Sequence, residues 1–316
     1  MSNSTLSISV SGLKKAYAGR PVLENLNFAV PKGSIYTLLG SNGAGKTTTI
    51  RILTTQIPAD QGEAEIEGYS VSKSPHKVRE VISLTGQFSA VDEALTGKEN
   101  LVLMARLRQL PFPKKSALDL LEYFGLADAA DQRVSSYSGG MKRKLDIAMS
   151  LTGHPKVIFL DEPTTGLDPQ SRRSMWKLIK ELQASGVTIF LTTQYLEEAE
   201  ELADRIAILD KGKIIAEGTS RELKSYLPQD ALEFFFQDPE SLEAAASLLK
   251  DYKTAFVPEE YKLTVFTDGK GDTLAGICSM LYQDCIKIRD FARLTPRLED
   301  VFLSMIDRKE KNRDEI

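Results

Sequence analysis

The glycine-rich segment at residues 40–48 has the residue types and the spacing of a phosphate-binding loop. It matches the pattern G-x-x-x-x-G-K-[ST]. Glycines allow the backbone to wrap closely around phosphate groups, with the N–H groups pointing inward. In such a loop the lysine reaches the β- and γ-phosphates, and the hydroxyl after it ligates Mg²⁺. The residues expected to bind a nucleotide here are Gly40, Ser41, Asn42, Gly43, Ala44, Gly45, Lys46, Thr47 and Thr48.

The segments on either side provide the structure that this loop requires. Ile35–Leu39 is an apolar run that predicts a buried strand, and residues 48–56 predict a helix. A helix that begins at the loop adds the positive end of its dipole to the phosphate site.

A second set of chemical groups follows an apolar run at Val157–Leu160, which predicts a central parallel strand. Asp161 and Glu162 close this run, and ligands of an open α/β sheet bind at the carboxyl ends of its strands. We expect Asp161 to hold Mg²⁺, directly or through water. Glu162 is expected to lie next to the γ-phosphate and to polarise the attacking water.

A third motif offers a second site for an anion, about 90 residues after the first glycine loop. Ser138 is a good N-cap for a helix predicted over residues 142–151, and Gly139 and Gly140 leave the start of that helix bare. A bare helix N-terminus with a hydroxyl group can bind phosphate. One ATP needs only one such loop from its own chain, so the second loop is available to another nucleotide.

With these motifs in this order, the chain resembles the ATP-binding subunit of ABC transporters over roughly residues 5–220. The resemblance makes Gly40–Thr48 the Walker A motif, Ser138–Gly140 the signature, and Asp161 with Glu162 the end of Walker B and the catalytic glutamate. It further implies that Gln87 is the Q-loop glutamine, which contributes to catalysis and to the Mg²⁺ site. Asp168 matches the D-loop, and Tyr17 matches the aromatic residue that stacks on adenine.

Three positions depart from the family pattern. Tyr137 replaces the usual leucine and Met141 the usual glutamine of the signature, whereas the phosphate-binding serine and glycines are intact. Gln194 stands where the family has its switch histidine. A glutamine amide can donate to the γ-phosphate but cannot become cationic, so Glu162 carries the role of base more exclusively. The sequence around Gln87 and Gln194 is similar to that of daunorubicin-resistance ATPases, which commonly carry this glutamine.

The expected fold is α/β, with two domains. Residues 1–220 would form a P-loop ABC ATPase domain with an antiparallel β subdomain, built from strands at 5–11 and 22–30, and a helical subdomain between Gln87 and Ser138. Residues 221–316 predict a small accessory domain of the α+β class. Its strands at 232–236, 253–257, 261–267 and 286–291 and its helices at 239–252 and 272–283 follow the order βαββαβ of ferredoxin-like units. A last helix is predicted over residues 296–305.

Composition excludes several classes of protein. The net charge of −4 gives no indication of a nucleic-acid-binding surface. The apolar runs are too short to cross a bilayer, and the first residues lack the features of a signal peptide. Cys278 and Cys285, like His76 and His154, lack the spacing of a metal site. We therefore expect a cytoplasmic protein. The resemblance implies that it lies at the cytoplasmic face of the cell membrane and needs a separate multi-spanning permease.

The resemblance implies that two chains, most simply a homodimer, enclose two ATP molecules head to tail, with hydrolysis driving transport. Export of drug-like or amphiphilic compounds is favoured by the same resemblance. Two alternatives belong to other functional classes: a non-transport ABC ATPase, or a regulatory nucleotide sensor without turnover. The single set of motifs argues against the first alternative, and the pair Asp161 and Glu162 argues against the second.

Overall fold

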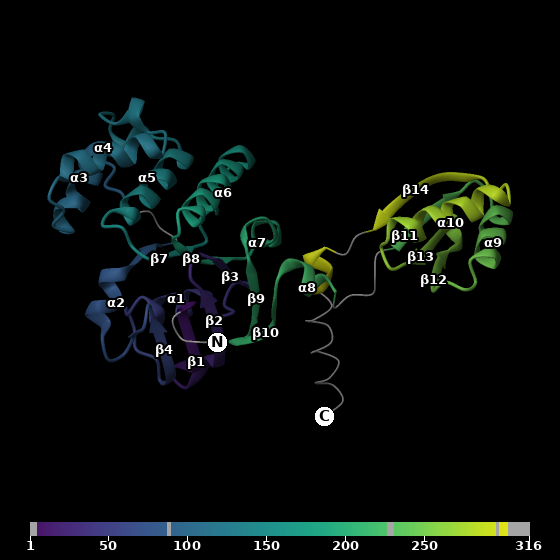
Figure 1. The fold of residues 1–316 in the computed structure, drawn as a ribbon, viewed down its shortest axis with the longest axis horizontal. Helices are drawn as coiled ribbons and strands as arrows, with labels where there is room; N and C mark the ends of the chain where they lie inside the picture. Colours follow the sequence, from purple (N-terminus) through teal and green to yellow (C-terminus); the bar gives the residue numbers. More distant parts are fainter. Residues whose placement is uncertain (1–4, 87–89, 226–230, 295–296, 303–316) are drawn as a thin grey trace. The chain divides into compact units, whose positions relative to one another are not determined.

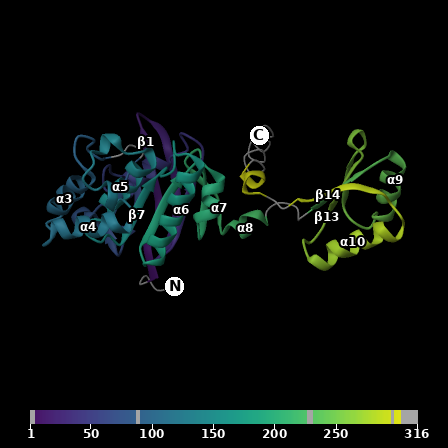
Figure 2. The ribbon, with the colours of Figure 1, turned by 90° about the horizontal axis from the view of Figure 1, so that it is seen from above.

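The computed structural model describes residues 5–86, 90–225, 231–294 and 297–302. The chain divides into two compact units, residues 1–220 and residues 221–316. Figure 1 labels the helices and strands of both units, and Figure 2 shows them from a second direction. Each unit is described separately below.

A six-stranded sheet forms the centre of the first unit, with the order β10-β9-β3-β8-β7-β6. All neighbouring strands run parallel except β10, which pairs antiparallel with β9. The central strands are continuous apolar runs because both of their faces are covered. The strands span Lys213–Gly218 (β10), Arg205–Asp210 (β9), Ile35–Leu39 (β3), Thr188–Thr193 (β8), Val157–Asp161 (β7) and Ile82–Thr85 (β6).

An antiparallel sheet packs beside this layer, as the sequence predicts. Its order is β2-β1-β4-β5, with the strands Arg20–Pro31 (β2), Leu6–Tyr17 (β1), Gln61–Ile66 (β4) and Tyr69–Ser70 (β5). Strands β1 and β2 extend beyond the predicted bounds, because the hairpin remains paired as far as Tyr17 and Arg20.

Alternate residues of the central strands belong to two different cores. Tyr36, Phe159 and Phe190 face the antiparallel sheet, where Tyr36 stacks on Phe28 with ring centroids 5.3 Å apart. Ile158 and Leu191 face the other way, into a core built with helices. This alternation is the period of two expected of a strand.

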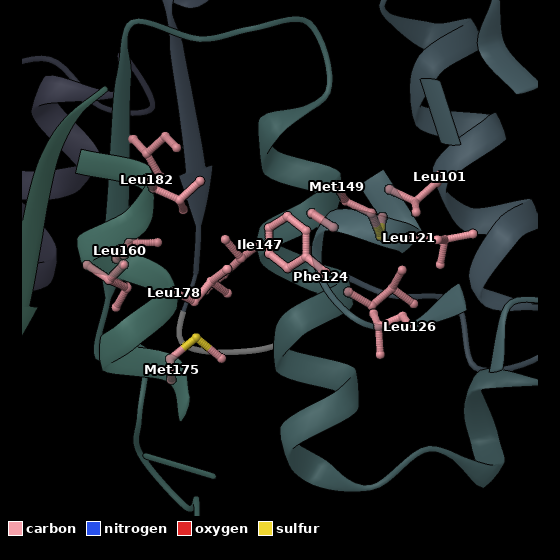
Figure 3. Packing of buried hydrophobic residues seen from close by; sticks show 14 of the residues in the cluster. Leu101, Leu121, Phe124, Leu126, Ile147, Met149, Leu160, Met175, Leu178 and Leu182 are labelled. Atoms are coloured by element: carbon pink, nitrogen blue, oxygen red, sulfur yellow. The ribbon is translucent and has the colours of Figure 1, made fainter. Parts of the chain in front are cut away.

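Eight helices are assigned among the described residues of the first unit and its boundary. Side chains of α5 lie between those of α6 on one side and those of α3 and α4 on the other (Figure 3). Ile147 and Met149 of α5 therefore join the core under the central sheet to the core of the helical subdomain. The helices span Lys46–Leu53 (α1), Pro75–Val81 (α2), Gly97–Leu107 (α3), Pro113–Tyr123 (α4), Gly139–Leu151 (α5), Pro169–Ala184 (α6), Leu196–Leu202 (α7) and Ser220–Lys224 (α8).

The second unit has the predicted order of strands and helices. Its strands Ala231–Phe236 (β11), Thr254–Val257 (β12), Lys262–Phe266 (β13) and Ile288–Leu294 (β14) form an antiparallel sheet of order β12-β13-β11-β14. The helices Pro239–Leu248 (α9) and Gly271–Gln283 (α10) share one apolar core with Phe234 and Phe236. Residues 298–302 are helical. Of the other residues in the helix predicted over 296–305, Arg297 is described and is not helical, whereas 296 and 303–305 lie outside the described residues.

Three short 3₁₀ helices complete the described elements: Ala127–Ala129, Val134–Ser136 and Pro258–Glu260. Within the described ranges, no helix has the length and apolar character needed to cross a membrane.

Candidate functional site

The candidate residues meet because neighbouring parallel strands end at the same edge of the central sheet. Leu39 pairs with Thr193, and Asp161 pairs with Thr192, so the segments after β3, β8 and β7 leave the sheet side by side. The amide of Gly40 donates to the carbonyl of Thr193 at 3.2 Å. The phosphate loop begins at Gly40, directly after Leu39. Glu162 directly follows Asp161, and Gln194 directly follows Thr193. All three therefore lie at the edge where α/β sheets bind ligands.

The glycine loop is built closely against the rest of the site. A Cβ on Gly40 would lie 2.5 Å from the carbonyl oxygen of Leu209. At Gly45 the backbone has φ 113°, and a Cβ would lie 2.6 Å from a methyl group of Leu23. Helix α1 begins directly after Gly45 with no side chain capping its first N–H groups. These donors therefore remain available to an anion at the helix N-terminus.

Lys46 lies at the centre of this edge and is 4% exposed. Its ammonium donates to the carbonyl of Gly40 at 2.8 Å and to that of Ser41 at 3.1 Å. It also lies 3.3 Å from the carboxylate of Glu162. The structure thus brings together the lysine of the loop and the acid of β7 that the sequence singled out.

Asp161 and Glu162 occupy different environments although they are adjacent. Asp161 is 5% exposed, and the hydroxyl of Thr192 donates to its carboxylate at 2.5 Å. Glu162 has φ 49°, in the left-handed region that residues other than glycine rarely adopt. Its amide donates to the carbonyl of Thr192 at 3.0 Å. Backbone strain of this kind is common at functional sites, where the surrounding structure maintains it.

Ser138 and Asp168 are both helix N-caps. The Ser138 hydroxyl accepts from the amide of Met141 at 3.2 Å at the start of α5. A hydroxyl that accepts in this way still has its own proton to donate. Asp168 accepts from the amides of Gln170 and Ser171 and from the Ser171 hydroxyl, which hold the pKa of this carboxyl below its usual range.

The two glycines of the signature begin helix α5 beside helix α6. A Cβ on Gly140 would lie 2.9 Å from the hydroxyl oxygen of Ser171, whereas Gly139 has no neighbour so close. Tyr137, one of the departures from the family pattern, is buried, and its hydroxyl donates to the carbonyl of Ala129 at 2.6 Å. Tyr137 therefore anchors the start of the signature segment to the helical subdomain.

Tyr17 lies at the tip of the β1–β2 hairpin, and its side chain is 43% exposed. The same hairpin contacts the phosphate loop, because a Cβ on Gly45 would lie 3.0 Å from the carbonyl oxygen of Val22. Thr47 is exposed and Thr48 half-buried in the first turn of α1. The ammonium of Lys15 lies 5.6 Å from the centroid of the Tyr17 ring, and this partly exposed ring remains a candidate for contact with a base.

Gln194 follows β8 directly, and its side chain is half-buried. Its amide has no hydrogen-bond partner among the described residues, so it remains available to a ligand at the same edge. Gln87 lies outside the described residues.

Three buried charged residues at this site were not identified from the sequence. Arg143 and Asp146 form an ion pair of 3.2 Å on α5, and Arg143 donates to the carbonyls of Gly86, Asp161 and Pro163. Glu198 of α7 is fully buried and accepts from the hydroxyl of Thr164 at 2.7 Å and from the indole of Trp176 at 3.2 Å. The available signal was a charge on the apolar face of a predicted helix.

A parallel sheet with this glycine loop after β3 and an acid pair at the end of β7, two strands away, defines a P-loop nucleotide-binding protein. The ABC transporter family matches residues 23–165. The daunorubicin/doxorubicin resistance ATP-binding protein DrrA of Streptomyces peucetius is 43% identical, covering 95% of this chain and 92% of that protein. The doxorubicin resistance ATP-binding protein DrrA of Mycobacterium tuberculosis is also 43% identical, covering 96% of this chain and 95% of the relative.

Solved structures agree with the sequence relatives. An ATP-binding subunit of an ABC transporter matches with a TM-score of 0.62 and 30% identity, covering 69% of this chain and 92% of that structure. The chain belongs to the family of ABC transporter ATP-binding proteins. As a member of this family it binds and hydrolyses ATP. ATP-binding subunits of the family work with membrane permeases and associate in pairs, and the two alternative functional classes are not favoured.

Proposed function

We propose that this ATPase drives the export of drug-like or amphiphilic compounds through a separate membrane permease. The observation that carries the proposal is 43% identity to a daunorubicin/doxorubicin resistance protein over 95% of the chain, which includes both units. Other relatives are named for resistance to linearmycin and for export of Nod factor.

Each residue at the carboxyl ends of the central strands has its own role in hydrolysis. The uncapped N–H groups at the start of α1, within Gly40–Thr48, and the ammonium of Lys46 bind the triphosphate, while Tyr17 stacks on the adenine. Thr47 and Asp161, with Gln87, would hold Mg²⁺, which neutralises charge on the phosphates. The structure fits this ion, since Thr47 is exposed at the helix start and the carboxylate of Asp161 is oriented by Thr192.

Glu162 takes the proton of the attacking water, because its carboxylate lies at the phosphate loop, 3.3 Å from the ammonium of Lys46, and is released from this ion pair when Lys46 binds phosphate. Gln194 donates its amide to the γ-phosphate from the end of β8. Asp168 keeps α6 in place through its cap, so that the D-loop presents a fixed backbone to the second subunit. Loss of the γ-phosphate removes the contacts of Lys46 and Gln194 together.

The second phosphate-binding loop acts on the nucleotide of a second copy of the chain. The capped start of α5 offers the Ser138 hydroxyl together with the bare backbone of Gly139 and Gly140 to an anion. A head-to-tail homodimer places each such helix start over the ATP of the other subunit, with the same surface of both chains in contact. ATP therefore closes the dimer, and hydrolysis opens it.

The ATPase domain at residues 1–220 contacts the permease at the cytoplasmic face of the membrane, through the segment of Gln87 and residues 90–108. Leu103 and Leu107 of α3 support this surface, because they are 46% and 69% exposed although they are apolar. Residues 221–316 form an accessory ferredoxin-like domain that braces the ATPase or contributes to the dimer. A membrane-spanning partner is required by this function.

Transport measured with the native permease tests the proposal. Inverted membrane vesicles that contain the permease expose the ATPase on their outer face. ATP and doxorubicin are added to the medium, and the quenching of doxorubicin fluorescence reports accumulation of the drug inside the vesicles. We expect accumulation with the wild-type ATPase and none with Lys46→Ala, while Lys177→Ala, a change in a surface ion pair with Glu181, serves as the matched control. Uptake that is equal for wild type and Lys46→Ala would refute the proposal, as would the absence of uptake for a panel of bulky amphiphiles.

A further inference from the structure

Arg143 is a buried cation on the signature helix whose guanidinium bonds mainly to backbone. It is 8% exposed and makes four hydrogen bonds to described residues. Two of them end on the carbonyl oxygens of Asp161, at 3.2 Å, and Pro163, at 2.8 Å. These carbonyls lie on the two sides of Glu162.

The carbonyl of Pro163 needs such a donor because it lies beyond the sheet. Strand β7 ends at Asp161, and its last pair with β6 joins Leu160 to Thr85. Among the described residues, no pair of β6 and β7 lies past this one, and a buried carbonyl without a partner is costly. A guanidinium has five donors in a rigid plane, so a single side chain can bind several carbonyls at once.

Asp146 extends the same contact to another segment. It lies one turn after Arg143 on α5, is 4% exposed, and accepts from Arg143 at 3.2 Å and from the amide of Ala90 at 3.3 Å. Arg143 itself donates to the carbonyl of Gly86 at 2.8 Å. The ion pair therefore holds Gly86 and Ala90, the residues on the two sides of the segment that contains Gln87.

Stability alone does not account for a pair of this kind. Burial lowers the pKa of the Arg143 guanidinium and raises the pKa of the Asp146 carboxyl, because desolvation penalises both charged forms. Apolar replacements of buried ion pairs are often as stable as the pair, whereas removing one partner is strongly destabilising. The specific gain here is geometric, since one rigid group connects α5, the end of β7 and the loop after β6.

We propose that Arg143, oriented by Asp146, is a positioning residue for ATP hydrolysis. It fixes the backbone on both sides of Glu162 and couples this backbone to Gly86 and Ala90. The fixed backbone thereby orients the carboxylate that activates water. The inference rests on the proposed role of Glu162 as the base.

The test compares steady-state ATP hydrolysis and ATP affinity of the full chain with both charges removed. In the double variant Arg143→Met with Asp146→Leu no buried charge is left unpaired, so we expect folding to be retained. A displacement of about 1 Å in a catalytic group can cost about 100-fold in rate, and we expect kcat to fall about 10- to 100-fold. The Kd for ATP should change less than about threefold, since the triphosphate is bound by other residues.

Two further variants make the result specific. Ser150→Ala removes another buried hydrogen bond from α5, the 2.7 Å bond to the carbonyl of Ile147, and should leave kcat unchanged. Arg143→Lys keeps the charge but loses the planar fork, so it should retain more activity than Arg143→Met. If the double variant does not fold, the comparison of Arg143→Lys with Asp146→Asn, each normalised to the fraction that binds ATP, replaces it.

A folded double variant with kcat within twofold of wild type would overturn the inference, as would a loss of ATP affinity equal to the loss of kcat. Glu162→Gln is measured in parallel to keep the two proposals apart. If Glu162→Gln abolishes hydrolysis and the Arg143 variants do not reduce it, only the present inference fails. If Glu162→Gln hydrolyses like wild type, the proposed role of Glu162 as the base is refuted, and the inference that rests on it is refuted with it.

Discussion

The ammonium of Lys46 lies 3.3 Å from the carboxylate of Glu162, and both side chains are less than a tenth exposed. The residue that we expect to bind the γ-phosphate and the residue that we expect to activate water therefore form an ion pair. A triphosphate competes with Glu162 for Lys46. Binding of ATP would thus transfer the lysine from the carboxylate to phosphate and leave the carboxylate free to accept a proton.

Replacing Glu162 by Gln should separate binding from hydrolysis. The amide attracts Lys46 less strongly than the carboxylate, so the affinity for ATP should be unchanged or increased. Hydrolysis should fall by about 10²- to 10⁴-fold, the usual effect of losing a general base. Size-exclusion chromatography with ATP should then show a stable dimer. Glu201→Gln changes an acid of a surface ion pair with Lys180 and is the control. A Glu162→Gln protein with wild-type turnover would contradict the role of base.

Replacing Lys46 by Ala should weaken nucleotide binding as well as hydrolysis. A charge-assisted hydrogen bond to phosphate contributes about 1.5–3 kcal/mol, which corresponds to a loss of affinity of about 10- to 150-fold. Fluorescence titration with a labelled ATP analogue measures the Kd. Circular dichroism checks the fold, because the change also leaves Glu162 without its partner. An affinity close to that of wild type would show that Lys46 does not bind the phosphates.

Gln194 should affect turnover more than binding, because it directly follows β8 beside Gly40 and is expected to contact only the terminal phosphate. Gln194→Ala should lower the ATPase rate per folded molecule while the affinity for ATP falls much less. Gln194→His should retain substantial activity, since both side chains can donate one N–H group from this position. Steady-state rates measured with the permease provide the comparison. Wild-type turnover in the Ala variant would remove Gln194 from the catalytic residues.

Glu198 should make folding stability depend on pH. It is fully buried, one of its carboxylate oxygens has no partner among the described residues, and burial raises the pKa of its carboxyl above the ordinary 4.5. The folded state therefore binds the proton more tightly than the unfolded state. Stability from this group is complete below pH 4.5 and is lost as the pH rises through the raised pKa.

Glu198→Gln has no such titration, so the variant should gain stability relative to wild type as the pH rises above 4.5. Each unit of pKa shift corresponds to about 1.4 kcal/mol. Urea denaturation at several pH values between about 4.5 and 8 gives the difference in the free energy of unfolding. A difference that is constant over this range would show that Glu198 does not titrate differently in the folded and unfolded states. Such a constant offset would report only the packing of the amide.

The sequence by itself determined the elements and the main chemical groups. The phosphate loop was recognisable because glycine and lysine at a fixed spacing are a local requirement of phosphate binding. The strands at Ile35–Leu39 and Val157–Asp161 were predicted because a parallel strand buried on both faces is a continuous apolar run. The order of strands and helices in residues 231–294 was likewise predicted from local periodicity.

Only the tertiary structure decided which groups meet. Lys46 and Glu162 are more than one hundred residues apart, and their contact depends on the order of the strands in the sheet. Arg143 binds a carbonyl 57 residues away, at Gly86, and no pattern predicts this, because every residue has a carbonyl. The selection of these carbonyls depends on where the strands end and where α5 packs, and both follow from long-range packing.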